Sequence, residues 1–172
     1  MVFIVGYMGS GKSTFGKRLA RQIDYDFIDL DKLFEETYKI CISNFFTKYG
    51  EEMFRNIEHE LLLKNLAHPN TVVSCGGGTP CYFDNMDLMN TAGLTVYLRL
   101  TPAALANRLE SSRKERPLLQ YLPGIDLQGK ICNHLQQRES FYLKARMIVD
   151  GMSINMEETT AKILQVLQQE NV

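Results

Sequence analysis

Five short apolar runs are spaced along the chain, and longer amphipathic segments separate them. The runs cover residues 1–5, 25–28, 71–74, 94–98 and 147–149. Most do not alternate between apolar and polar positions, which predicts strands that are buried on both faces of a sheet. Helical periodicity predicts helices over 12–22, 31–38, 51–66, 102–109, 126–145 and 156–168. Strands that alternate with helices indicate βαβ units around a parallel sheet.

The segment 111–124 departs from this alternation. It carries four charged residues at 113–116, followed by two prolines and a glycine. Because a strand and two helices are still predicted after it, we expect a mobile excursion over the surface and not a linker between domains. An ordinary solvated loop is the alternative.

Length and composition narrow the class of protein. The 172 residues fit one domain with a single core. The net charge of −1 argues against a nucleic-acid partner, and no apolar run approaches the roughly 20 residues that cross a bilayer. No basic stretch precedes the first strand, so we expect no signal peptide and a cytoplasmic protein. The four cysteines lack zinc-site spacing and are expected to be free thiols.

Residues 6–13 contain the most informative motif. They read Gly-Tyr-Met-Gly-Ser-Gly-Lys-Ser between the first predicted strand and helix, which matches G-x-x-x-x-G-K-[ST]. Glycines let successive backbone N–H groups surround a phosphate, and the helix that follows directs its positive end toward it. Lys12 would reach the outer phosphates, and the Ser13 hydroxyl could ligate Mg²⁺. The motif predicts a nucleoside triphosphate binder without separating kinases from GTPases or ATPases.

Two carboxylates help to separate these classes. The chain has no Asn-Lys-x-Asp motif, which a GTPase would use to read its base, and a motor ATPase should be larger. Asp29 and Asp31 instead end the second predicted strand. At that position one carboxylate can hold Mg²⁺, and the other can orient or deprotonate an attacking hydroxyl. Capping of the next helix, for instance by Asp31, is the alternative.

Further polar and glycine positions indicate an anionic acceptor. Arg55 and Glu58 share a helix face and can form an ion pair. On a surface such a pair contributes little to stability, but inside a cleft Glu58 would orient Arg55 to bind a carboxylate. Residues 76–78 are three glycines after the third strand, which let a ligand approach bare backbone unless they form only a flexible loop. Arg116 and Arg138 add two guanidinium groups. Together these sites suggest a small, hydroxylated, anionic acceptor.

In combination these motifs resemble the shikimate kinases. The matching stretches are GYMGSGKST from residue 6, DLD at 29–31, GEEMFRNIE at 50–58, CGGGTP at 75–80, TVYLRLTPAALANRL at 95–109, RPLL at 116–119 and RESFY at 138–142. The resemblance implies an α/β three-layer P-loop NTPase fold, with a five-stranded parallel sheet flanked by helices. It implies a single kinase domain over 1–172, a substrate-binding helical segment at about 31–62 and a mobile lid at about 111–124.

The resemblance also implies site roles. Catalytic roles would fall to Lys12, Asp31 and Arg116. The ATP-binding set would be Gly9, Ser10, Gly11, Lys12, Ser13, Thr14, Arg108 and Arg116. The shikimate-binding set would be Asp31, Arg55, Gly76, Gly77, Gly78 and Arg138. Ser13 and Asp29 would hold Mg²⁺. The family's Arg-x-Pro-Leu-Tyr reads RESFY here, and Arg146 offers a competing guanidinium.

The implied activity is Mg²⁺-dependent transfer of the ATP γ-phosphoryl group to the 3-hydroxyl of shikimate, giving shikimate 3-phosphate in chorismate and aromatic amino acid biosynthesis. The expected partners are shikimate and ATP, with no membrane and no nucleic acid, and the protein is expected to be a monomer. Another small-molecule kinase, such as a gluconate kinase, is the nearest alternative. A catalytically silent nucleotide-binding module is a second one.

Overall fold

The structure, a computed structural model, describes residues 1–111 and 126–169. Five strands form one parallel sheet in the order β2-β3-β1-β4-β5. They are β1 (Val2–Val5), β2 (Asp26–Asp29), β3 (Thr71–Ser74), β4 (Leu94–Arg99) and β5 (Met147–Asp150). Every predicted strand is present, with only its ends shifted. The predicted lid lies outside the described residues apart from Ser111, which caps α5 (Pro102–Glu110).

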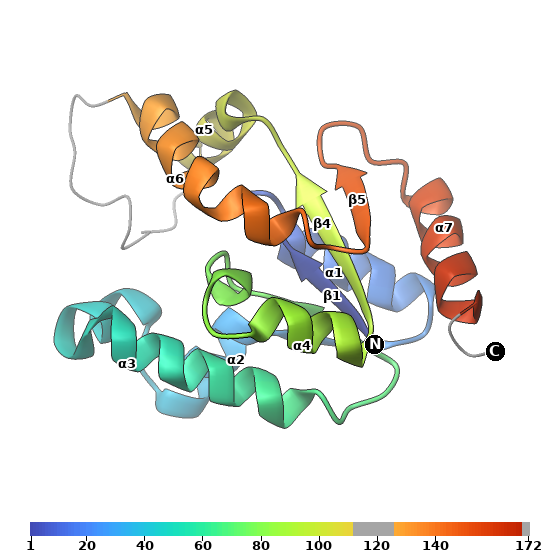
Figure 1. The fold of residues 1–172 in the computed structure, drawn as a ribbon, viewed down its shortest axis with the longest axis horizontal. Helices are drawn as coiled ribbons and strands as arrows, with labels where there is room; N and C mark the ends of the chain where they lie inside the picture. The colour runs from blue at the N-terminus through green and yellow to red at the C-terminus, as the bar shows by residue number, and fades with distance from the viewer. Residues whose placement is uncertain (112–125, 170–172) are drawn as a thin grey trace.

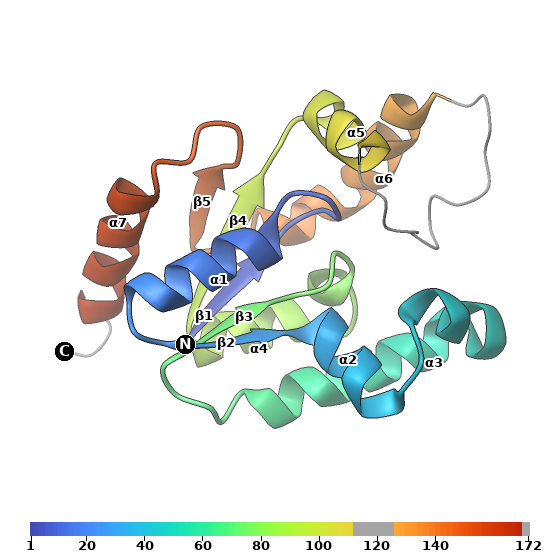
Figure 2. The same cartoon turned by 180° about the vertical axis from the view of Figure 1, so that it is seen from behind.

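Helices cover both faces of the sheet (Figures 1 and 2). One face carries α1 (Lys12–Gln22) and α7 (Met156–Gln169), and the other carries α4 (Asn85–Ala92) and α6 (Leu127–Tyr142). Two further helices, α2 (Leu30–Tyr38) and α3 (Ile42–Asn65), extend from the β2 side. A short 3-10 helix, η1 (Thr79–Cys81), follows β3. The architecture is the three-layer α/β fold that the sequence predicts.

Burial differs between central and edge strands. β1 and β3 are buried along their whole length, as is β4 up to Arg99. The edge strands β2 and β5 are only partly buried, so the expectation of two buried faces was wrong for them. An edge strand has a neighbour on one side only, and its other side meets solvent. Within the described residues no helix is long and apolar enough to cross a membrane.

Two helical stretches were not predicted. The first is α4, whose buried set includes the polar residue Asn85 beside Met86 and Met89, so its apolar pattern is interrupted. The second is the stretch 42–49, which precedes the predicted helix over 51–66 and forms α3 together with it. Gly50 joins its two halves with φ 82° and ψ 169°, a backbone conformation that favours glycine. α3 is therefore kinked at Gly50, and the prediction located only the part that follows the kink.

A second apolar cluster lies outside the main core and joins α2 to α3. It consists of Phe34, Phe45, Phe54 and Leu61. The ring centroids of Phe34 and Phe54 are 4.9 Å apart, and those of Phe34 and Phe45 are 5.0 Å apart, typical of favourable aromatic pairs. Because Phe54 is fixed in this cluster, the rotation of α3 about its axis is fixed, and with it the direction of the neighbouring Arg55 side chain.

Candidate active site

The carboxyl ends of β1, β2 and β3 lie at one edge of the sheet. The chain leaves β1 toward β2 through α1 and leaves β3 toward β4 through α4, which covers the opposite face. Ligands of parallel α/β sheets bind where connections diverge in this way. A cavity of about 340 Å³ lies there, and its lining includes Lys12, Asp31, Arg55, Gly76, Gly77, Gly78 and Arg138. The structure therefore brings these sequence-predicted residues together.

The loop after β1 has the backbone of a phosphate site. Gly6, Gly9 and Gly11 have φ of 140°, 80° and 97°. Gly11 is the N-cap of α1 and makes no side-chain cap, so the first N–H groups of the helix remain directed at a ligand. The buried Lys12 Nζ donates to Gly6 O and Tyr7 O, each at 2.9 Å, which holds the ammonium inside the loop.

Three further residues predicted to contact the nucleotide, Ser10, Thr14 and Arg108, lie in or next to this loop. Ser10 Oγ is the buried side-chain oxygen without a hydrogen-bond partner in the described part of the chain, as expected where a ligand is still to bind. Arg108 donates from Nη1 to Ser10 O at 2.8 Å and from Nη2 to Gly151 O at 3.1 Å. It thus links the phosphate loop to the loop after β5. Thr14 is exposed on the first turn of α1.

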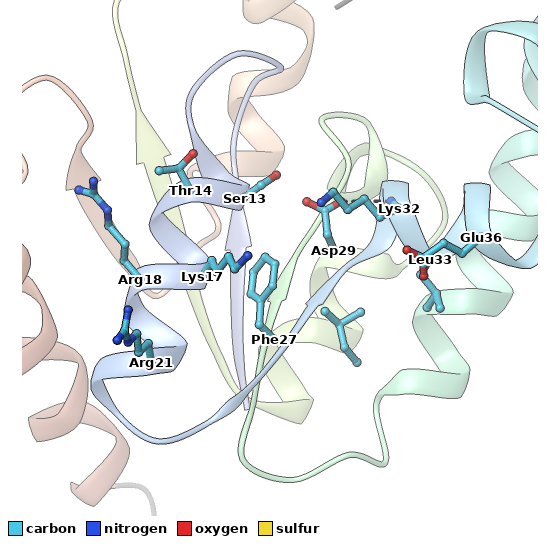
Figure 3. Close-up of a pocket in the computed structure, with 11 residues that line it drawn as sticks. Ser13, Thr14, Lys17, Arg18, Arg21, Phe27, Asp29, Lys32, Leu33 and Glu36 are labelled. Atoms are coloured by element: carbon cyan, nitrogen blue, oxygen red, sulfur yellow. Dashed lines mark hydrogen bonds between the residues drawn. The ribbon is translucent and has the colours of Figure 1, made fainter.

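Ser13 and Asp29 line a neighbouring cavity of about 650 Å³ between α1 and α2. In Figure 3 both side chains lie at the end nearest the phosphate loop, whereas Arg18 and Arg21 project from α1 away from Asp29. Hydroxyl and carboxylate oxygens are the donors that Mg²⁺ prefers, so these residues fit that ion. Residues 1–111 and 126–169 contain no cluster of three His, Cys, Asp or Glu that could hold a metal alone.

The cap of α2 is Asp29, which accepts a hydrogen bond from the Lys32 N–H at 3.3 Å. The alternative of helix capping is thus confirmed for Asp29 and wrong for Asp31, because Asp31 lies within the first turn. Its carboxylate instead faces the glycine segment: Asp31 Oδ1 lies 2.9 Å from the position that a Cβ on Gly76 would take. The two carboxylates thus line different cavities.

Arg55 lies in a buried charge cluster. Its Nη1 donates to Glu58 Oε2 at 2.8 Å, and Nη2 and Nε donate to Glu51 Oε1 at 2.8 and 3.2 Å. Arg55 and Glu58 are only 5% and 4% exposed, so this is not the weak surface pair of the alternative interpretation. Burial alone lowers the pKa of Arg55, but Glu58 and Glu51 raise it above its usual value.

A second layer fixes the two carboxylates. Tyr82 donates its hydroxyl to Glu51 at 2.9 Å, and its ring centroid lies 4.4 Å from Arg55 Cζ, a cation–π distance. Thr79 Oγ1 donates to Glu58 Oε1 at 2.6 Å. Sequence reasoning missed these partners. Only Glu51, one helical turn before Arg55, carried a signal in its spacing; Tyr82 comes close through the fold alone.

Steric contact explains why residues 76–78 are glycines. None of the three has a positive φ, so conformational freedom is not the reason. A Cβ on Gly78 would lie 2.5 Å from Cζ, Nη1 and Nη2 of Arg55, and one on Gly76 would lie 2.5 Å from Glu58 Oε1. A Cβ on Gly77 would lie 3.1 Å from Met8 N in the phosphate loop. The segment is therefore a close-approach surface and not merely a flexible loop.

Arg138 and Arg146, the two candidates for the second guanidinium group, lie in different environments. Arg138 on α6 is 7% exposed and lines the 340 Å³ cavity. Arg146 is exposed and precedes β5, at the other end of the sheet from the carboxyl ends of the strands, so Arg138 is the better match for the predicted site. Arg116 lies outside the described residues.

A phosphate loop after the first strand of a parallel sheet, with an acceptor cavity at its side, defines a P-loop kinase of the small-molecule class. Comparison with known proteins identifies the family. A family model described as shikimate kinase matches residues 8–168. The shikimate kinase of Parabacteroides distasonis is 42% identical over 166 residues, covering 96% of both chains. The chain belongs to the shikimate kinase family.

Solved structures agree with this assignment. A crystal structure of shikimate kinase from Bacteroides thetaiotaomicron superposes with a TM-score of 0.88 at 36% identity, covering 97% of each chain. Shikimate kinase from Acinetobacter baumannii in complex with shikimate gives 0.86 at 28% identity, covering 99% and 94%. A gluconokinase from Sinorhizobium meliloti gives 0.65 at 17% identity, a likeness of fold alone.

The buried cluster predicts a large difference between two neighbouring glutamates. Glu58→Ala should lower the free energy of unfolding by about 3 kcal/mol, because Arg55 stays buried with only Glu51 as counter-charge. Glu60→Ala, two residues further along the helix and in the exposed pair with Lys64, should change it by less than about 0.5 kcal/mol. Urea unfolding at neutral pH measures both. Equal losses in the two variants would show that the Arg55–Glu58 pair contributes no more to stability than the exposed Lys64–Glu60 pair.

Proposed function

We propose that this protein is an ATP-dependent kinase that transfers the γ-phosphoryl group of ATP to the 3-hydroxyl of shikimate. The observation that carries the proposal is the 340 Å³ cavity, in which Lys12 and Asp31 face two buried guanidinium groups, Arg55 and Arg138. The A. baumannii relative bound to shikimate supports the choice of acceptor. The product would be shikimate 3-phosphate.

Arg55 and Arg138 would hold the carboxylate of the acceptor. Within the described chain, Arg55 uses three of its five N–H donors in contacts with Glu51 and Glu58. The three are the Nε donor, one of the two on Nη1 and one of the two on Nη2. One donor on each terminal nitrogen therefore remains for a planar carboxylate. Arg138 would supply the second cation. Gly76, Gly77 and Gly78 would contact the ring of the acceptor through bare backbone.

Phosphoryl transfer would depend on positioning and on neutralisation of charge. Backbone N–H groups over Gly9–Thr14 would bind the phosphates, and Lys12, now held by two loop carbonyls, would turn to the transferred group. Asp31 would orient the 3-hydroxyl and accept its proton as the bond to phosphorus forms. Arg108 would contact the adenine, and Arg116 retains the lid role that the resemblance implies.

Ser13 and Asp29 are the residues that would hold Mg²⁺, Asp29 through water. The ion, when bound, neutralises charge on the β- and γ-phosphates. Most of its remaining ligands would come from ATP and water, which fits the small number of protein oxygens at this position. A cytoplasmic location and a monomeric state stay predictions, supported by the composition of the chain.

ADP release coupled to a dehydrogenase reaction tests the proposed function. We expect release that requires ATP, Mg²⁺ and shikimate together, and no release above background with gluconate in place of shikimate. Release with gluconate but not with shikimate would favour the other small-molecule kinase. Nucleotide binding with no acceptor-dependent release would favour the silent module.

Asp31→Asn separates acceptor alignment from nucleotide binding. The amide keeps the size of the side chain but cannot accept the hydroxyl proton, so turnover should fall by about 10²–10⁴-fold. The dissociation constant of ATP should stay within about twofold of the wild-type value, because Asp31 lines the acceptor cavity and not the phosphate loop. Steady-state turnover and nucleotide titration provide the two values. Near-wild-type turnover would remove Asp31 from the mechanism.

A further inference from the structure

The helix that carries Arg138 is tied to both loops of the acceptor cavity. On α6, His134, Arg138 and Tyr142 follow one another at intervals of four, so their side chains lie on one face. His134 Nδ1 is 2.9 Å from the Tyr7 hydroxyl in the phosphate loop. The Tyr142 hydroxyl donates to Gly77 O in the glycine segment. Arg138 thus lies between two hydrogen bonds, one turn from each.

The two loops also contact each other. A Cβ on Gly77 would lie 3.1 Å from Met8 N, so the glycine segment and the phosphate loop pass at van der Waals distance. Phosphate loop, glycine segment and α6 therefore form a closed frame of contacts beside the cavity. Tyr7 has a further part in this frame, because its carbonyl accepts a hydrogen bond from Lys12 Nζ.

Charge and burial indicate that these hydrogen bonds persist. Tyr7 and Tyr142 are 1% and 0% exposed. Burial raises the pKa of Tyr7 to about 12 and raises that of Tyr142 well above its usual value, so both hydroxyls keep their protons and can donate. Burial and the charge of Arg138 lower the pKa of His134, which keeps the imidazole neutral with Nδ1 able to accept. The positive charge of Arg138 lowers the pKa of all three groups, as expected from its position between them.

We propose that His134 and Tyr142 are positioning residues that hold the Arg138 guanidinium at the acceptor cavity, by anchoring α6 to Tyr7 and to Gly77. The inference rests on the proposed function for the identity of the ligand, a carboxylate. Neither His134 nor Tyr142 is among the residues that line the acceptor cavity. Each acts through Arg138, whose reach into the cavity depends on how α6 is held.

Kinetic constants for variants at the first anchor test the idea. His134→Leu and Tyr7→Phe should each raise the KM for shikimate about tenfold, and leave the KM for ATP within about twofold. The double variant should be no worse than either single one, because one hydrogen bond is lost in all three. His134→Asn places an acceptor oxygen where Nδ1 lies, and it should restore the KM to within about twofold of the wild-type value. Gln137→Leu, on the exposed side of the same helix, is the matched control.

A comparison of substrates tests whether the effect passes through Arg138. The wild type should prefer shikimate to its uncharged methyl ester, and His134→Leu or Tyr142→Phe should reduce that preference about tenfold. Combining these two changes should reduce it further, since the two anchors are separate. A residue that only stabilises the fold would lower the melting temperature without changing this preference.

Amide hydrogen exchange on the unliganded protein gives a readout that needs no substrate. Exchange over 134–142 should be faster in Tyr7→Phe and Tyr142→Phe, which keep the rings and should fold, than in the wild type and Gln137→Leu. Unchanged exchange, or equal changes in the KM for shikimate and for ATP, would overturn the proposal. A wild type without shikimate-dependent ADP release would instead remove the proposed function, and the exchange result would still decide whether α6 is anchored in this way.

Discussion

The burial of one guanidinium group constrains much of this structure. A buried cation is costly unless carboxylates and hydrogen bonds surround it. Arg55 meets that requirement with Glu58 and Glu51 on its own helix and with the ring of Tyr82. A side chain at position 76 or 78 would displace atoms of this cluster, because a Cβ there would lie 2.5 Å from them. The buried charge cluster therefore favours glycine at positions 76 and 78.

The lining of the acceptor cavity combines charges of both signs without a large excess of either. In the described chain four cationic residues line it, Lys12, Lys32, Arg55 and Arg138, against the three carboxylates Asp31, Glu35 and Glu58. The difference, four minus three, is one positive charge, close to the near-neutral balance of the whole chain. Two guanidinium groups and the Asp31 carboxylate line the same cavity, so it offers separate groups to a carboxylate and to a hydroxyl. Phe46 and Phe54 contribute apolar surface to its lining.

Local pattern in the sequence predicted the sheet, the phosphate loop and most helices, because each depends on residues close together in the chain. The N-cap of α5 is an example: Thr101 accepts from the Ala104 N–H at 3.3 Å and is followed by Pro102, a pair typical of the start of a helix. The start of α3 and the whole of α4 were missed, since Gly50 and the buried Asn85 interrupt their patterns. Contacts between distant segments, such as Tyr82 with Glu51 or His134 with Tyr7, have no signal in one sequence.

The most direct test of acceptor recognition adds a single methyl group beside Arg55. Calorimetric titration of Gly78→Ala with shikimate should show affinity at least about tenfold weaker than that of the wild type, because the new Cβ displaces the guanidinium. The affinity for ATP should stay within about twofold, since the three atoms nearest to a Cβ at residue 78 all belong to Arg55 and not to the phosphate loop. Unchanged affinity for shikimate in a folded Gly78→Ala protein would contradict the central place of Arg55 in this site.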